Sequence, residues 1–249
     1  MLTFDIICLA KSTKLGGICL AGIKTDGTGW LRPISNRING TLYPEHYTLR
    51  DGREVQLFDI IRIPMIRYEP KCHQPENYLI HYSYKWQILG QATLEQVRKL
   101  IKPEIKKNSA EPKLLGNVDR RIRYEDLQIS PIKSSLTIIN PEKLKWQIQY
   151  NSKNEKNFRC LFYLCGNFYD LPITDPIWID KLNYLEAGIY SCEEVIEKLK
   201  LENFEPDKFR LTISLGEPFK PSAEKQEFCY KLVASVINVA DITKRLGWK

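Results

Sequence analysis

Aromatic and basic side chains alternate beside a predicted hairpin, in a pattern suited to binding a polyanion that carries flat bases. Trp30 and Arg32 are two residues apart in an extended segment, so they are expected on one face of a strand, with Leu31 on the opposite face. An aromatic ring can stack on a base, while basic side chains follow the phosphates. Lys11 and Lys14 follow the first predicted strand, over 3–10, and are expected near this hairpin.

The same residues also have structural interpretations, which the sequence leaves open. Trp30 could seal one end of a β barrel, and Arg32 could pair with a buried carboxylate. Thr174 is predicted to cap a short helix that begins near Asp175, where a carboxylate interacts favourably with the helix dipole. Both could instead hydrogen-bond a base or a sugar edge. Ser214 precedes Gly216 in a predicted glycine turn, whose amides could meet a ligand oxygen.

Lys231 interrupts the otherwise apolar stretch "YKLVASVI" in the last predicted strand. A lysine in this position points either to the outer face of the sheet or to a binding face, with Tyr230 on the other side. The sequence does not decide between the two orientations.

Short β segments dominate the chain. The turn around Asp26 and Gly27 predicts a tight hairpin, and Thr93 with Gln96 forms a capping-box pattern for a helix over 93–101. A basic connection over 105–123 separates two regions rich in strand signals. The sequence therefore predicts a mainly β (α+β) fold of small β barrels, closed or half-closed, with a few inserted helices and with domains at 1–130 and 131–249.

Composition narrows the function classes. The 249 residues carry 37 Lys and Arg against 30 Asp and Glu, a net charge of +7 that favours polyanionic partners. No apolar run approaches the length of a membrane span, and no signal peptide is recognisable, so we expect a cytoplasmic protein without membrane contact. Seven irregularly spaced cysteines without a Cys-x-x-Cys pair predict no disulfide, no metal site and no cofactor.

Catalysis has weaker support than binding. The three histidines lie in the first half of the chain without a recognisable nucleophile pattern, and no phosphate-binding glycine loop occurs. A nucleic-acid-processing enzyme, such as a nuclease using His73 or His81 with Glu76, stays as one alternative. A protein–protein adaptor is the other.

Four pieces of the sequence resemble the dual OB-containing domain family. Their order and joint presence carry the resemblance, which extends from the first predicted strand to the last. The pieces are "CLAKSTKLGGICLAG" with "GWLRPIS" (8–22 and 29–35), "YDLPITDP" (169–176), "LTISLGEPF" (211–219) and "CYKLVASVI" (229–237).

The resemblance implies that these are two tandem OB-like small β barrels, with a nucleic-acid-binding role in a prokaryotic family often found near defence genes. We therefore expect single-stranded RNA or DNA, or a nucleotide-like ligand, as the partner, with an effector protein as a further candidate. A groove between the barrels is the expected site. The expected nucleic-acid contacts are Lys11, Ser12, Lys14, Trp30, Arg32, Ser35, Thr174, Asp175, Ser214 and Lys231.

Overall fold

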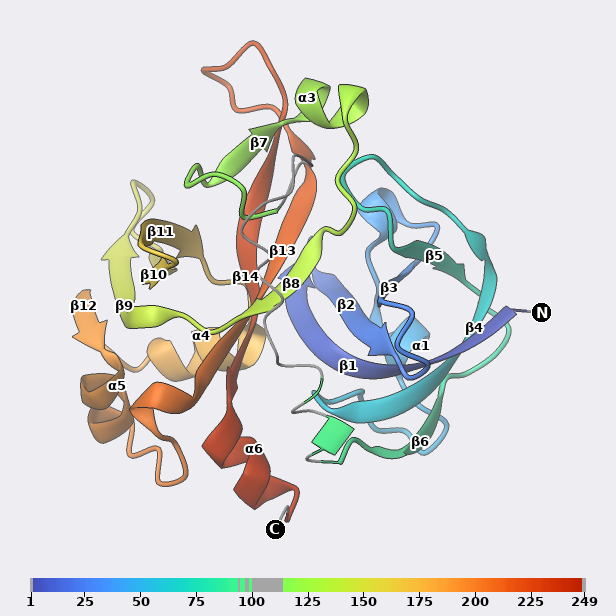
Figure 1. The fold of residues 1–249 in the computed structure, drawn as a ribbon, viewed down its shortest axis with the longest axis horizontal. Coiled ribbons are helices and arrows are strands. Elements are labelled where there is room, and N and C mark those ends of the chain that lie inside the picture. Colours follow the sequence, from blue (N-terminus) through green and yellow to red (C-terminus); the bar gives the residue numbers. More distant parts are fainter. Residues whose placement is uncertain (1, 94, 97–98, 100–113, 248–249) are drawn as a thin grey trace.

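The computed structural model describes residues 2–93, 95–96, 99 and 114–247, and its fold is mainly β, as predicted (Figure 1). The strands described in the N-terminal half are β1 (Leu2–Lys14), β2 (Gly17–Lys24), β3 (Trp30–Ile34), β4 (Asp59–Tyr68), β5 (Asn77–Ile80) and β6 (Gln87–Gln91). Those described in the C-terminal half are β7 (Arg121–Arg123), β8 (Leu136–Ile139), β9 (Glu142–Tyr150), β10 (Lys156–Leu164), β11 (Asn167–Pro172), β12 (Gly188–Ser191), β13 (Phe209–Phe219) and β14 (Phe228–Asn238).

The N-terminal strands form a closed barrel. The sheet order is β1-β2-β3-β5-β4-β6, and β1 also pairs with β4, which closes a five-stranded barrel with β6 added to β4. The predicted hairpin joins β2 to β3, with Gly27 and Gly29 at positive φ. Alternate residues of these strands, including Leu20, Leu31 and Ile61, are fully buried in the barrel core. The predicted OB-like barrel is therefore present in this half.

The C-terminal half consists of two four-stranded sheets around one core. Their orders are β11-β10-β9-β12 and β7-β14-β13-β8. The rings of Trp146, Trp178 and Phe209 lie 4.8–5.5 Å apart in this core, and all three side chains are buried. Because β7 pairs with β14, residues 121–123 belong structurally to this half, and the proposed boundary at residue 130 stays a prediction.

Short helices connect the strands: α1 (Pro44–Tyr47), α3 (Tyr124–Ile129), α4 (Pro176–Leu182), α5 (Cys192–Lys198) and α6 (Val239–Arg245), with 3₁₀ turns at Ile38–Gly40 and Pro206–Lys208. The prediction that Thr174 caps α4 is wrong by one residue. The Asp175 carboxylate accepts hydrogen bonds from the amides of Ile177 and Trp178. Thr174 instead pairs with β14, because its amide donates to the carbonyl of Val233.

The predicted glycine turn after Ser214 is also wrong. Strand β13 continues through Gly216 to Phe219, and its pairing with β14 shifts register between Leu215 and Pro218. A β bulge absorbs the irregular sequence without ending the strand. Ser214 is therefore a residue inside a buried strand, where its hydroxyl meets other side chains.

The predicted helix over 93–101 is described only at its start. Thr93 and Gln96 exchange the two hydrogen bonds of a capping box, as the pattern predicts. Residues 94, 97–98 and 100–113, which include most of the basic connection, lie outside the described residues. In the described part of the chain, no helix combines the length and the hydropathy that crossing a bilayer demands.

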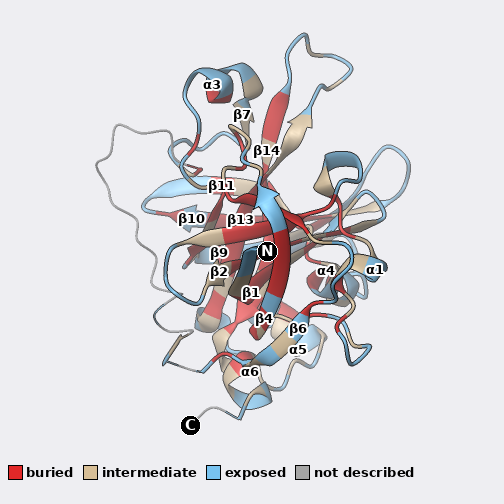
Figure 2. Ribbon diagram, turned by 90° about the vertical axis from the view of Figure 1, so that its right-hand side faces the viewer, coloured by how far each residue is buried: buried red, intermediate tan, exposed pale blue. Residues whose placement is uncertain are grey.

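A shared apolar cluster joins the two halves. Ile7 and Leu9 of β1 pack with Ile138 of β8, Ile237 of β14 and Ile242 of α6. The hydroxyl of Thr212 on β13 also donates to the carbonyl of Leu9 at 2.8 Å. The central parts of β1 (6–10) and β13 (211–215) are buried, and Figure 2 shows buried colour along the middle of β1.

Replacing Leu9 by Ala is expected to lower the free energy of unfolding by about 2–5 kcal/mol, the usual cost of removing a large buried aliphatic side chain. Because Leu9 contacts both halves, amide exchange should accelerate in β13 and β14 as well as in β1. Denaturant titration with hydrogen-exchange mass spectrometry measures both effects. Faster exchange confined to the N-terminal barrel would contradict the shared core.

Candidate nucleic-acid interface

A buried charge network lies where the N-terminal barrel meets the C-terminal half. Arg32 on β3 is 2% exposed, and its Nη2 lies 3.1 Å from the Glu76 Oε1 atom. The same nitrogen donates to the hydroxyls of Ser135 and Ser214 at 2.8 and 3.2 Å, and Nη1 approaches the sulfur of Cys19 at 3.1 Å. Arg32 therefore pairs with a carboxylate of its own half, which is the structural alternative, and its bonds to Ser135 and Ser214 reach the C-terminal half.

Glu76 completes this network from the loop before β5. Its Oε1 atom accepts a short hydrogen bond from the hydroxyl of Ser135, and its Oε2 atom accepts from the Ser135 amide at 3.3 Å. Both charged groups are almost completely buried, so each depends on the other for compensation. The network fixes β3 against the start of β8.

A second polar cluster lies around Glu217 of β13. The Glu217 carboxylate contacts Lys14 Nζ at 3.0 Å, Lys71 Nζ at 3.2 Å and His73 Nε2 at 2.9 Å. Burial acts to raise the pKa of Glu217, but the hydrogen bond from His73 and the charges of Lys14 and Lys71 hold that pKa well below its usual range. Lys14 is thus engaged in an ion pair between the two halves.

A cleft of about 290 Å³ opens beside the Arg32–Glu76 pair. Residues from both halves line it: Lys24, Thr28, Gly29, Trp30, Tyr68, Pro75, Glu76, Tyr78, Lys133 and Ser134. Trp30 is half-buried, because it also packs on the small apolar cluster shared by the two halves. The rings of Tyr68 and Tyr78 are 4.9 Å apart, and the Lys24 Nζ atom lies 6.0 Å from the Tyr78 ring centre.

This lining combines aromatic faces with basic groups. Trp30, Tyr68 and Tyr78 provide rings, Lys24 and Lys133 provide positive charge, and the only carboxylate among the lining residues is already paired with Arg32. Rings with nearby ammonium groups suit a planar base attached to a phosphate. The structure therefore has a cleft between the two halves at Trp30, where a groove was expected.

The other residues expected to contact nucleic acid lie outside the lining of this cleft, and most have protein partners. The Lys11 Nζ atom is 2.7 Å from the Glu54 Oε2 atom. Lys231 is fully buried and donates from Nζ to the side chain and carbonyl of Asn117 at 2.7 and 2.9 Å. Its side chain therefore reaches neither an exposed outer face nor the cleft.

The small polar residues of the expected set are also in the interior. Ser35 donates a short hydrogen bond to the carbonyl of Thr41, and Ser12 is buried in β1. Asp175 caps α4 and accepts from the amide of Val236 at 2.8 Å, while burial raises its pKa. Nucleic-acid contact by these residues stays a prediction, and their observed partners are within the protein.

Sequence reasoning missed the two tyrosines and two lysines that line the cleft. Tyr78 reaches Trp30 because β3 pairs in parallel with β5, which no local pattern indicates, and Tyr68 pairs with Tyr78 across β4 and β5. Lys24 ends β2 and lies beside Trp30 through the β2–β3 hairpin. Lys133 comes from the segment before β8, and its position depends on how the two halves dock.

The described residues contain neither a disulfide nor a cluster suited to a metal ion. All seven cysteines are free thiols. Across residues 2–93, 95–96, 99 and 114–247, no three His, Cys, Asp or Glu side chains gather in a way that could hold a metal ion. The histidines considered for catalysis are elsewhere: His73 pairs with Glu217, and His81 accepts from the amide of Ser83 at 3.3 Å.

Residues 4–236 match the model of the family described as "Dual OB-containing domain". The chain therefore belongs to this family, which confirms the resemblance drawn from its motifs. No curated protein matches the sequence significantly.

Two solved structures have a remotely similar arrangement. One is a crystal structure of the tetrameric p202 HIN2, with a TM-score of 0.30 and 10% identity over 95% of this chain and 93% of that chain. The other is a murine DNA-binding protein bound to double-stranded DNA, with a TM-score of 0.27 and 9% identity over 96% of this chain and 100% of that chain. Similarities this remote give no information about the function of the present chain, which has to be argued from its own structure.

Replacing Glu76 by Ala should lower the free energy of unfolding by about 3–5 kcal/mol, because it leaves the Arg32 charge buried without its carboxylate. The double variant Arg32→Met/Glu76→Met removes both charges and should recover much of that loss. Urea titration of the parent, the single variants and the double variant measures the coupling. If the double variant loses as much free energy of unfolding as the two single variants together, Arg32 and Glu76 are not coupled.

Glu217 should make the protein sensitive to acid. Its folded pKa is lowered, so its contribution to stability is complete above the unfolded pKa of about 4.3 and is lost as the pH falls through and below that value. We expect the Glu217→Gln variant to be less stable than the parent at neutral pH but to change less between about pH 5 and pH 3. Urea midpoints across this range measure the difference, and parallel curves would contradict it.

Proposed function

We propose that the chain is a nucleic-acid-binding module that holds single-stranded RNA or DNA in the cleft beside Trp30. The observation that carries the proposal is the lining of this cleft, where three aromatic rings lie with two lysines between the halves. Trp30 stacks on one base, Tyr68 and Tyr78 contact its neighbour, and Lys24 and Lys133 interact with the phosphates.

Single strands fit this arrangement better than a duplex does. Base stacking on protein rings needs an unstacked base, which a single strand offers without breaking base pairs. A cleft of about 290 Å³ has room for individual bases. A nucleotide-like ligand would use the same rings and lysines.

The buried Arg32–Glu76 network contributes to this site indirectly, because it lies at the edge of the cleft. Arg32 neutralises Glu76 at the edge of the cleft, so a phosphate near Lys24 or Lys133 meets less repulsion from that carboxylate. In this proposal Arg32 positions the walls and does not touch the strand. A role in antiviral defence and a partner effector protein belong to the proposal through the family resemblance alone, whereas a cytoplasmic location stays an expectation from the sequence.

Trp30→Ala should weaken binding of strands of about 12 nucleotides by about 1–3 kcal/mol and leave the salt dependence nearly unchanged, as expected for a stacking contact. Trp30→Phe, which retains a ring, should lose less. Fluorescence anisotropy with labelled oligo-U and oligo-dT measures both variants, with Tyr84→Ala as the control at an exposed tyrosine outside the cleft lining.

The lysines should behave differently from the ring. Lys24→Gln and Lys133→Gln should each lower the slope of log affinity against log salt by about 0.7, because each removes one phosphate contact to a single strand. Lys85→Gln, at a lysine that donates to the carbonyl of Glu45, is the matched control. A parent protein without salt-dependent binding to either oligonucleotide would overturn the proposed function.

A further inference from the structure

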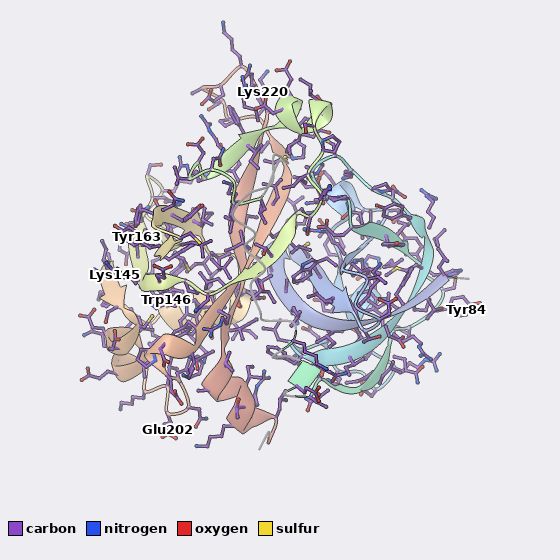
Figure 3. The ribbon with its side chains drawn as sticks, in the orientation of Figure 1. Tyr84, Lys145, Trp146, Tyr163, Glu202 and Lys220 are labelled. Atoms are coloured by element: carbon purple, nitrogen blue, oxygen red, sulfur yellow. The ribbon has the colours of Figure 1, made fainter. Side chains whose placement is uncertain are left out.

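A second group of exposed rings and lysines lies on the outer face of the sheet formed by β9, β10 and β11. Tyr163 on β10 is directly opposite Phe168 on β11, and Lys145 on β9 is opposite Leu161 on β10. Because side chains alternate across a strand, Lys145, Leu161, Tyr163 and Phe168 share one face, with Lys143 beside them at a β bulge. Figure 3 shows Lys145 and Tyr163 at the same outer edge of the C-terminal half.

The two rings are exposed although their neighbours are in the core. Tyr163 is 39% exposed and Phe168 is 48% exposed, whereas Phe162 and Tyr169, the adjacent residues in sequence, are buried and stacked on each other. The core therefore uses the other side of these strands. The exposed pair is an aromatic surface that packing of the described residues does not require.

The geometry of the pair leaves ring faces available. The ring centres of Tyr163 and Phe168 are 5.4 Å apart and inclined by 58°, so the rings do not stack on each other. The Lys143 Nζ atom lies 5.5 Å from the centre of the Tyr163 ring. An ammonium group next to two inclined rings offers stacking and phosphate contact to successive nucleotides.

The charge of this face favours an anionic occupant. Lys143 and Lys145 are exposed, while the Asp170 carboxylate is already paired with Arg159 at 2.5 Å. Glu142, the other carboxylate on these strands at this end of the sheet, pairs with Tyr163 across β9 and β10. Two exposed lysines thus stand against one carboxylate that has no basic partner among the described residues, and Lys143 lies beside the Tyr163 ring.

We propose that this outer face, consisting of Lys143, Lys145, Tyr163 and Phe168, is a second binding surface for single-stranded nucleic acid. This inference rests on the proposed function in one respect, that the chain binds nucleic acid. It does not depend on the cleft, because none of these four residues lines the cleft at Trp30. Two successive bases stack on Tyr163 and Phe168, and the flanking phosphates meet the two lysines. A strand of sufficient length then contacts two separate surfaces of the same molecule.

The first test removes the rings in the full chain. With labelled oligo-U of about 16 nucleotides, Tyr163→Ala and Phe168→Ala should each weaken binding by at least about fivefold, and Tyr163→Phe should bind as the parent does. Tyr184→Ala, at an 80% exposed tyrosine outside this face, is the matched control and should have no effect. Photo-crosslinking of 4-thiouridine strands to the parent should mark peptides that contain Tyr163 or Phe168.

The second test removes the charge and is independent of the rings. The double variant Lys143→Gln/Lys145→Gln should lower the salt slope by about 1.4, while the same change at the exposed Lys198 should not alter it. Thermal melting of every variant checks the fold, which should be unaffected because the substituted side chains are exposed.

The outcomes separate this inference from the proposed function. If the parent binds no single strand, both are wrong. If Trp30→Ala weakens binding while the ring and lysine variants of the outer face bind as the parent does, only the second surface is wrong. If the parent self-associates in sedimentation and Tyr163→Ala abolishes this without changing oligonucleotide affinity, the face is an interface between copies of the chain, and the inference is also overturned.

Discussion

The Arg32 guanidinium is a permanent positive charge buried at the junction of the two halves, and the rest of the arrangement depends on satisfying it. Such a charge needs hydrogen-bond acceptors with defined directions, and these come from both sides of the junction. Cys19 and Glu76 approach it from the N-terminal barrel, while Ser135 and Ser214 approach it from the C-terminal half. A rotation of one half against the other would break these bonds. The apolar cluster around Leu9 supplies much of the burial, whereas the charge network supplies the orientation.

The cleft is a consequence of the same junction. Trp30 is two residues before Arg32 on β3, and Glu76 belongs to both the buried network and the wall of the cleft. Fixing the charge therefore also fixes the position of the ring relative to Lys133 of the other half. A binding site with walls set by buried contacts loses little conformational entropy when a ligand enters. This makes the cleft the better-defined of the two surfaces.

Most basic residues near the junction are neutralised by protein partners, so the net charge of +7 is a poor guide to the binding surface. Lys11 and Lys14 each pair with a glutamate, and burial lowers the pKa of Lys231 to about 8 although Asp119 opposes that shift. The basic groups around the two aromatic surfaces are different residues. The cleft has Lys24 and Lys133, and the outer sheet face has Lys143 and Lys145. Position, more than total charge, decides where a polyanion can bind.

The sequence by itself determined the family, the mainly β class and several local features. Four ordered motifs identified the family, the Asp26–Gly27 turn located the β2–β3 hairpin, and Thr93 with Gln96 predicted a capping box. These succeed because turns, caps and alternation depend on residues close together in the chain. The predicted face of Trp30 and Arg32, opposite the core residue Leu31, follows from the same local geometry.

Only the tertiary structure decided what those side chains meet. Arg32 and Lys231 are charged residues in strands, and both bond to partners more than 100 residues away in the chain, Ser135 and Asn117. Whether such a strand face is exposed or buried therefore depends on distant parts of the sequence. Tyr78 reaches Trp30 through the parallel pairing of β3 with β5, and no spacing in the chain encodes that pairing. Nothing in the sequence indicated the outer face at Tyr163 either. Exposed and buried aromatic residues occur alike in strands, and only the packed structure shows which face of a strand contacts the core.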